Sequence, residues 1–232
     1  MSAHARRVDL NADLGEEITD DAGLLALVTS ANVACGFHAG NGAIMREVCA
    51  EAARLGVAVG AQVSYADREN FGRVALDVPY EVLREQVAEQ VGTLSAIAVS
   101  EGIAVTYVKP HGALYHRTMD DADQARAVLD ASGELPVLGM PGVLLGLAAE
   151  AGRAVRHEGF PDRGYDDAGR LLPRAEAGAL ITEEAAIVAH ALVLAERVDS
   201  LCLHGDSPGA VHHARAVRRA LEADGWELRS VG

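Results

Sequence analysis

Five short segments of the sequence combine acidic, basic or imidazole side chains with glycines, and each one follows or continues a run of apolar residues. They are Asp9–Glu16, Cys35–Gly42, Tyr107–Tyr115, Glu158–Tyr165 and Leu201–Pro208. Side chains of these types transfer protons, hold anions or bind metals. Because the segments are far apart in the chain, their chemistry depends on a fold that brings them together.

The segment Tyr107–Tyr115 places Lys109 and His111 two residues apart at the end of an expected strand. Alternation along a strand points both side chains the same way. A desolvated lysine and a histidine both titrate near neutral pH, so the pair suits an acid, a base or an oxyanion clamp. The chain has 19 arginines and only this lysine. The alternative is a lysine that extends to solvent and a histidine that caps the turn.

Carboxylates and a second imidazole complete the candidate catalytic set. Asp13 follows Asn11 by two residues, so both can point inward, although Asp13 could instead close an Asx turn. Glu158 stands at the end of another expected strand. The predicted catalytic residues are Asp13, Lys109, His111, Glu158, His204 and Asp206.

A second set is predicted to bind the substrate. The glycine-rich turn with His38, Gly40 and Gly42 precedes an expected helix, whose free N–H groups suit a carboxylate or phosphate. Loop 64–78 is the expected lid, in which Phe71 shields the site and Arg73 clamps an anion, or else it is exposed filler. The predicted substrate-binding residues are Asn11, His38, Gly40, Gly42, Gln62, Arg73, Asp162 and Arg163. Asp162 and Arg163 could also form a mere surface pair.

Familiar cofactor motifs are absent. Met45 occupies the third small position of a dinucleotide fingerprint, and no G-x-x-x-x-G-K-[ST] sequence exists because Pro110 follows Lys109. The histidines and carboxylates at the expected strand ends could ligate a zinc or manganese ion. Hydrogen-bonded substrate recognition explains them equally well, and without an H-E-x-x-H or C-x-x-C motif no residue is assigned as a metal ligand.

Strand and helix patterns alternate along the chain. Strands are expected at residues 6–11, 30–34, 57–62, 104–109, 135–139, 154–158, 200–203 and 226–231, and helices at 44–55, 79–101, 122–131, 183–196 and 208–224. Such alternation predicts an α/β fold with a parallel sheet. An eight-unit barrel takes about 250 residues, so residues 1–232 are expected to form one domain, a β/α barrel of seven to eight units. In a barrel the strand ends converge, whereas an open sheet would spread the polar residues along an edge.

Composition narrows the functional classes. The net charge of −14 disfavours nucleic acid and anionic membranes as partners. No apolar stretch approaches the length of a membrane span and residues 1–7 lack a secretory pattern, so we expect a cytoplasmic protein. Cys35, Cys49 and Cys202 are expected to be reduced thiols.

The chain resembles the LamB/YcsF family from end to end. The resemblance is carried by residues 9–16, 30–40, 71–73, 108–115 and 202–206. It implies a distorted seven-stranded β/α barrel related to glycoside hydrolases and deacetylases. It also implies a role in ATP-dependent opening of 5-oxo-L-proline to L-glutamate with the partner subunits PxpB and PxpC, which would bind most of the ATP. Four residues depart from the family pattern: Gln62-Val63 replaces a usual His-Pro, Asn41 a usual aspartate and His116 a common asparagine.

Two other functions are also compatible with the sequence. One is a metal-dependent deacetylase or amidohydrolase that acts alone. The other is a subunit that binds a small acid while its partners perform the chemistry. If the function is the one that the resemblance implies, Lys109 and the glycine-rich turn are expected to bind the substrate carboxylate or the activated oxygen. A carboxylate among Asp13, Glu158 and Asp206 is expected to position the water. His111 or His204 is expected to move the proton.

Overall fold

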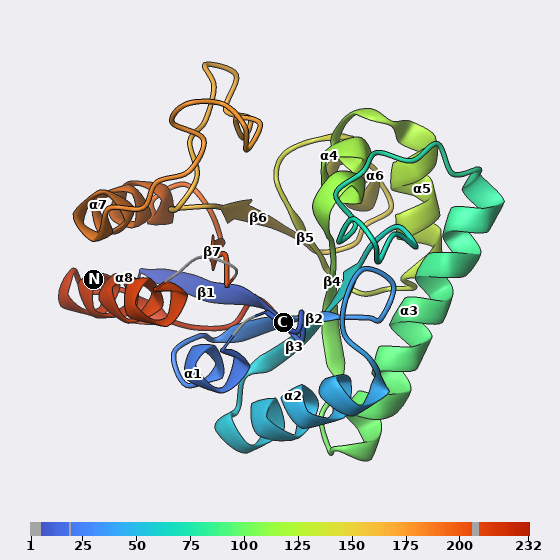
Figure 1. Cartoon of the computed structure of the whole chain (residues 1–232), viewed down its shortest axis with the longest axis horizontal. Coiled ribbons are helices and arrows are strands. Elements are labelled where there is room, and N and C mark those ends of the chain that lie inside the picture. Colours follow the sequence, from blue (N-terminus) through green and yellow to red (C-terminus); the bar gives the residue numbers. More distant parts are fainter. Residues whose placement is uncertain (1–5, 19, 206–208) are drawn as a thin grey trace.

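The computed structural model describes residues 6–18, 20–205 and 209–232. Seven parallel strands form a closed barrel (Figure 1): β1 (Arg7–Leu14), β2 (Ser30–Ala34), β3 (Ala58–Val63), β4 (Val105–Pro110), β5 (Val137–Gly139), β6 (Val155–Gly159) and β7 (Ser200–Leu203). Their order runs from β2 to β7 and then β1, and β1 also pairs with β2, which closes the ring. A short strand, β8 (Glu227–Leu228), pairs with Arg7 and Val8 at the start of β1.

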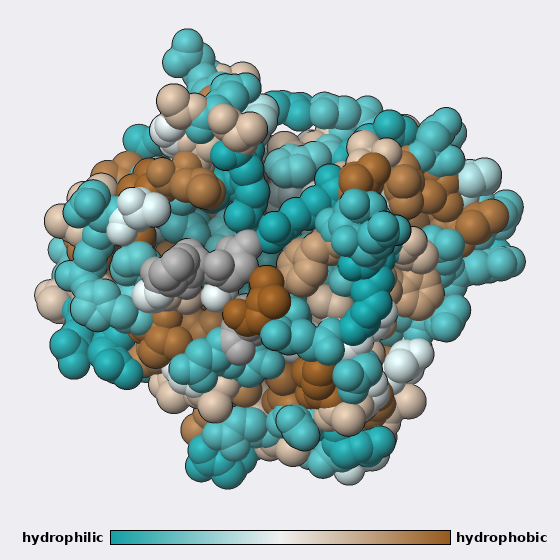
Figure 2. Space-filling view, in the orientation of Figure 1, coloured by the Kyte–Doolittle hydropathy of each residue, from teal (hydrophilic) through white to brown (hydrophobic). Residues whose placement is uncertain are grey.

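Helices surround the strands in Figure 1. They are α1 (Asp21–Leu25), α2 (Gly42–Leu55), α3 (Tyr80–Ser100), α4 (Gly112–Asp120), α5 (Ala122–Ala131), α6 (Val143–Glu150), α7 (Glu184–Ala195) and α8 (Ala210–Ala223). Between β6 and α7 a long segment, drawn in orange, projects away from the barrel (Figure 1). Figure 2 shows that the face in this view is mostly hydrophilic, with smaller apolar patches between.

The predicted distorted seven-stranded β/α barrel is confirmed. All eight expected strands form, β2 and β7 with the expected bounds and the others with shifted ends, and the five expected helices form as well. Helices α1, α4 and α6 were not expected. α1 has five residues, and α6 covers a strongly apolar stretch in which no helical periodicity is visible.

Strand β1 shows how the sequence separates the barrel interior from the outer core. Leu10, Ala12 and Leu14 belong to the main apolar cluster, which also contains helix residues. The alternate residues Asp9 and Asn11 are fully buried but hydrogen-bonded to other polar side chains. Because side chains alternate along a strand, one face of β1 packs against helices while the other fills the barrel with polar groups.

A glycine makes room for one of these interior side chains. A Cβ atom on Gly60 would lie 2.1 Å from the ring of Tyr107 on the neighbouring strand. The ring therefore lies over Gly60, and the Tyr107 hydroxyl donates a hydrogen bond to Asn32 Oδ1, one strand further on, at 2.7 Å. Gly60 thus positions a tyrosine beneath the polar site.

Within the described ranges, no helix is both long enough and apolar enough to cross a bilayer. Cys35, Cys49 and Cys202 are buried and free of disulfides. The prediction of unpaired thiols is therefore confirmed.

Candidate active site

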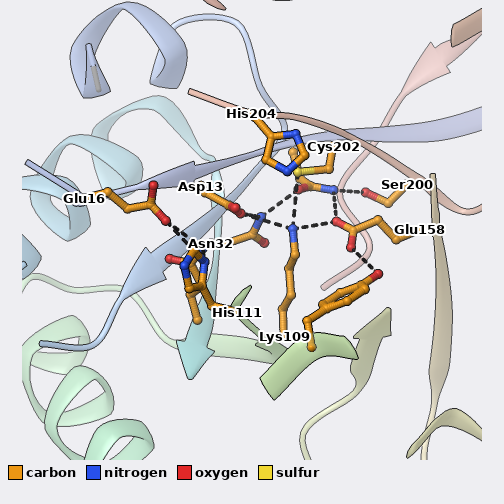
Figure 3. Close-up of polar contacts among 12 residues, drawn as sticks. Asp13, Glu16, Asn32, Lys109, His111, Glu158, Ser200, Cys202 and His204 are labelled. Atoms are coloured by element: carbon orange, nitrogen blue, oxygen red, sulfur yellow. Dashed lines mark hydrogen bonds and ion pairs between the residues drawn. The ribbon is translucent and has the colours of Figure 1, made fainter. Parts of the chain in front are cut away.

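Lys109 lies at the centre of the carboxyl end of the barrel (Figure 3). Its Nζ atom is 2.7 Å from Glu158 Oε1 and 3.1 Å from Asp13 Oδ1, and it donates to Cys202 Sγ at 3.3 Å. Lys109 comes from β4, Asp13 from β1 and Glu158 from β6. The lysine therefore joins two carboxylates from opposite parts of the chain in an almost fully buried ion triplet.

Neutral polar groups fix these carboxylates in place. Asn32 donates to Asp13 Oδ1 at 2.8 Å, and Asn11 donates to Glu158 Oε1 at 3.1 Å. The Tyr115 hydroxyl donates to Glu158 Oε2 at 3.0 Å. Each carboxylate thus has a defined orientation, and Asp13 does not form the Asx turn that the sequence left open.

The charges of this centre support one another. Burial is the largest effect and opposes ionisation of Asp13, but the Lys109 ammonium, together with His111, His204 and the Asn32 hydrogen bond, holds the pKa of Asp13 well below its usual range. Burial alone would lower the pKa of Lys109, yet Asp13, Cys202 and Glu158 raise it well above normal. These neighbours therefore favour the charged form of Lys109, against the expectation that desolvation would free its proton near neutral pH.

A second polar layer lies deeper in the barrel. Asp9 accepts hydrogen bonds from Thr29 at 2.6 Å and Ser30 at 2.7 Å, and Ser200 also donates to it. Burial, only partly offset by these bonds, raises the pKa of Asp9 to about 6. Ser200 also accepts from Asn11 at 2.6 Å, so this layer supports Asn11 and, through it, Glu158.

A separate cluster forms around Glu16, at the carboxyl ends of β1 to β4. Gln62 Nε2 donates to Glu16 Oε1 at 3.0 Å and lies 2.9 Å from His111 Nδ1. The rings of His38 and His111 stack with centroids 3.9 Å apart. Burial raises the pKa of Glu16, and burial followed by the neighbouring His38 lowers the pKa of His111 well below its usual range.

The hydrogen-bond partners define the tautomers of both imidazoles. His111 Nε2 is 3.1 Å from the Phe71 carbonyl, so this nitrogen donates and Nδ1 accepts from Gln62. Ser64 donates its hydroxyl proton to Tyr65 O, so its oxygen accepts from His38 Nδ1 at 2.9 Å. The unprotonated nitrogens, His38 Nε2 and His111 Nδ1, each lie 3.5 Å from Glu16 Oε1, and the lone pair of His111 Nδ1 also accepts from Gln62.

His204 and Asp162 form a third unit on the loops after β7 and β6. His204 Nδ1 is 2.9 Å from Asp162 Oδ2, and the His204 backbone N–H donates to the same oxygen at 3.1 Å. Burial opposes the His204 charge, but Asp162 prevails and raises the pKa of His204. Burial likewise opposes the Asp162 charge, yet His204 lowers the pKa of this aspartate. The two side chains have the geometry of a histidine that a carboxylate orients for proton transfer.

One cavity of about 450 Å³ opens above Lys109. Asp13, Glu16, Lys109, His111 and His204 form its polar floor. Tyr115 and Phe160 add aromatic surface. The remaining lining includes Arg73, His116, Arg163 and Arg174.

Phe71 packs edge-on against both His38 and His111, and Arg73 lies 4.8 Å above the Phe71 ring. The cavity thus combines an acidic and cationic floor with arginines at its edge.

The structure brings most of the predicted site residues to this end of the barrel. Asn11, His38, Gln62, Glu158 and Asp162 support the cavity from behind without lining it. Arg163 does line it, but its guanidinium donates to the carbonyls of Ala179 and Leu172 and so braces the projecting segment. Asp206 lies outside the described residues.

The expected anion role of Gly40 and Gly42 finds no support in the contacts around them. The Gly40 N–H donates to Glu17 at 3.1 Å, and Asn41 accepts from the first N–H groups of α2, those of Ala43 and Ile44. Neither glycine lines the cavity. The helix start is therefore occupied by its own cap rather than open to a ligand.

Several residues of the site are not distinguished by the sequence. Glu16 and Tyr115 close two of the five quoted segments, and their position next to Asp13 and His111 is the available signal. Asn32 and Cys202 occupy strands and resemble ordinary core residues. Arg174 stands on a long loop, where nothing in the sequence distinguishes it from the other arginines.

The fold and this site define the class: a closed parallel β/α barrel with a polar cavity at the carboxyl ends of its strands. The pattern of the LamB/YcsF family matches residues 8–232, so the chain belongs to the LamB/YcsF family. Proteins named as the A subunit of 5-oxoprolinase are similar over nearly their whole length. The one from Streptomyces avermitilis is 52% identical, covering 94% of this chain and 97% of that protein. The one from Mycobacterium avium is 47% identical, covering 96% and 98%.

Solved structures agree with this assignment. A lactam utilization protein from Thermus thermophilus superimposes with a TM-score of 0.90 and 38% identity, covering 96% of this chain and 99% of that one. A family 4 carbohydrate esterase from Streptomyces lividans aligns with a TM-score of 0.55 and 12% identity, covering 99% and 95%. The second likeness shows a shared fold only.

Proposed function

We propose that this chain is the lactam-binding subunit of a 5-oxoprolinase, which opens the ring of 5-oxo-L-proline to L-glutamate in the cytoplasm. The names of its 5-oxoprolinase relatives support this substrate. The observation that carries the proposal is the cavity, in which the Lys109 centre faces the His204–Asp162 pair with Arg73 and Arg174 at its edge. Each of these groups suits one part of a lactam that carries one carboxylate.

Arg73 and Arg174 are the groups suited to the substrate carboxylate, because guanidinium groups bind carboxylates with paired hydrogen bonds. Lys109 supplies a fixed positive charge for the lactam oxygen, where negative charge develops when water attacks the amide carbon. Asp13 lines the cavity beside Lys109 and orients the water. Its depressed pKa makes it a weak base, so it positions the water, and the proton that the water loses replaces the one that His204 gives to the ring nitrogen.

His204 is the proton carrier in this proposal. Hydrolysis breaks the bond between the carbonyl carbon and the ring nitrogen, and the nitrogen must gain a proton as it leaves. The raised pKa of His204 keeps it protonated closer to neutral pH, and Asp162 holds its ring through Nδ1. Both ring nitrogens of His111 are engaged by protein groups, which favours His204 over His111 for this step. Glu158 is saturated by Lys109, Asn11 and Tyr115 and acts through Lys109.

ATP and partner subunits complete the proposal. The sequence has no phosphate-binding loop, so we assign nucleotide binding mainly to partner subunits of the PxpB and PxpC type. The relatives are named as one subunit of an enzyme, which fits this division.

Reconstitution tests this function. The chain is mixed with PxpB and PxpC, and glutamate formation from 5-oxoproline is measured with and without ATP, and with each component omitted. Turnover that needs all components and is lost in His204→Gln supports the proposal. Lactam or amide hydrolysis by the isolated chain without ATP would identify a stand-alone amidohydrolase. Calorimetric binding of 5-oxoproline with full turnover in His204→Gln would leave this chain as a binding subunit.

A further inference from the structure

Glu16, His38 and His111 form a compact group that the proposed ring opening does not use. They come from the loops after β1, β2 and β4, and all three are buried. We infer that these three side chains form a binding site for one divalent transition-metal ion of the zinc type.

The spacing of the three ligand atoms fits such an ion. Glu16 Oε1 lies 3.5 Å from His38 Nε2 and 3.5 Å from His111 Nδ1. One atom from each residue lies within 4.8 Å of the others. Ligands about 2.1 Å from a tetrahedral ion are roughly 3.4 Å from one another. Small movements of the side chains therefore suffice for coordination.

The proton arrangement presents lone pairs rather than N–H groups to the centre. His38 is held through Nδ1 by Ser64, and His111 is held through Nε2 by the Phe71 carbonyl. Metal-binding histidines are commonly fixed in this way, with the outer nitrogen donating to a carbonyl or another oxygen. Two imidazole nitrogens and a carboxylate oxygen then face one place. The Gln62 amide donates to Glu16 and His111 there, and a cation in its stead would satisfy all three atoms.

Two unsatisfied atoms mark the same cluster. His38 Nε2 and Gln62 Oε1 are buried and have no hydrogen-bond partner among the described residues. A buried polar atom without a partner costs free energy and requires an explanation. A metal ion bound to His38 Nε2 provides one. Rotation of the Gln62 amide would turn its oxygen toward Glu16 and His111 and supply a further neutral ligand.

The surroundings determine the kind of ion. Two imidazoles and one carboxylate match the ligands of catalytic zinc, whereas magnesium and calcium prefer oxygen ligands alone. Glu16 and His111 line the cavity, so an ion can enter there and keep a coordination position open to it. Gly72 closes the cluster on another side, since a Cβ atom there would lie 3.0 Å from His38 Cβ and 3.3 Å from His111 Cδ2.

Metal binding to the full chain tests the inference directly. The protein is stripped with a chelator and titrated with Zn²⁺ by calorimetry and with Co²⁺ by visible absorption. We expect one ion per chain and cobalt bands typical of four- or five-coordinate nitrogen and oxygen ligands. Glu16→Gln and His38→Gln should weaken zinc binding by more than the roughly 10–100-fold that loss of an outer-shell partner costs. His190→Gln is the matched control, because His190 bonds the Pro161 carbonyl outside this cluster.

Folding of each variant is checked by circular dichroism, and zinc should raise the melting temperature of wild type and His190→Gln but not of the two ligand variants. Zinc that binds equally to wild type, Glu16→Gln and His38→Gln would overturn the site, as would the absence of stoichiometric binding to wild type. Because the readout is binding alone, the result is independent of whether the chain opens a lactam.

Discussion

Lys109 Nζ lies 2.7 Å from Glu158 Oε1 inside the barrel, where neither side chain is more than 2% exposed. This contact links β4 to β6, and the bond to Asp13 extends it to β1. Replacing Lys109 would remove the positive charge that the proposed ring opening uses. The buried ion triplet indicates that stability must suffer as well.

Lys109→Met should therefore lose both ring opening and stability. It leaves the carboxylates of Asp13 and Glu158 without their cation, and breaking a buried pair in this way costs about 3–5 kcal/mol. Urea unfolding measures the change. Arg54→Met, which removes an exposed pair with Glu51, should have little effect. The double variant Lys109→Met/Glu158→Gln should be less destabilised than the sum of the single changes. Additive costs would contradict the coupling.

Because Asp162 raises the pKa of His204, the stability of the folded protein should depend on pH. The raised pKa of His204 means that its charge stabilises the folded protein fully below its unperturbed value of 6.5, and that this contribution is lost as pH rises through the raised pKa. The lowered pKa of Asp162 adds stability above its usual 3.8, which is lost as pH falls through the lowered value.

Asp162→Asn should consequently lower the midpoint at which His204 loses its proton. NMR titration of the ring protons measures it, and the assignment follows from His204→Gln. The decline of stability above pH 6.5 that His204 causes should also disappear in Asp162→Asn. An unchanged His204 midpoint would show that Asp162 does not control this histidine.

Arg73 should act on substrate binding rather than on the chemical step. It lies at the edge of the cavity and above Phe71. Loss of a charged hydrogen bond of about 1.5–3 kcal/mol weakens binding roughly 10–150-fold. Arg73→Ala should therefore raise KM for 5-oxoproline in the reconstituted enzyme with a smaller change in kcat. Arg215→Ala, an exposed arginine on α8, is the control. A fall in kcat alone would place Arg73 in the chemistry instead.

The sequence was sufficient for the fold and for the location of the site because both depend on repetitive local patterns. Alternating apolar residues define strands such as β1, and polar residues at successive strand ends must meet in a closed barrel. The resemblance to the LamB/YcsF family also rested on these strand-end residues, including Lys109 and His111.

The roles within the site depended on contacts that one sequence does not contain. That Glu158 and Asp13 share one lysine follows from the registers of three strands. Gly40 and Gly42 fit the composition of an anion site, but Asn41 caps the helix and Glu17 takes the Gly40 N–H. Glu16 does not stand out in the sequence because its partners, His38 and His111, lie 22 and 95 residues away in the chain.

Asn41 illustrates how a departure from the family pattern can be structural. Its side chain accepts from the Ala43 and Ile44 N–H groups, which an aspartate would do equally well. Asn41→Ala should therefore destabilise the protein by about 1 kcal/mol, and Asn41→Asp should leave stability nearly unchanged. Denaturant unfolding distinguishes them. Neither should alter KM, and a large KM increase in Asn41→Ala would restore an anion role for this helix start.

Gly72 joins the loop that follows β3 to the imidazole cluster, and its backbone has φ +66°. A Cβ atom would sit against His38 and His111, while Gly112 already approaches the Gly72 carbonyl so closely that a Cβ there would lie 2.4 Å from it. Gly72→Ala should cost roughly 1–3 kcal/mol of folding stability through backbone strain and weaken zinc binding by displacing both rings.

Gly92→Ala is the matched control. Gly92 lies on the exposed side of α3, and a methyl group added there would meet no atom within 4 Å. Alanine should therefore stabilise the helix by up to about 1 kcal/mol. Gly72→Ala with wild-type stability and wild-type zinc affinity would mean that the two rings are not held by this glycine.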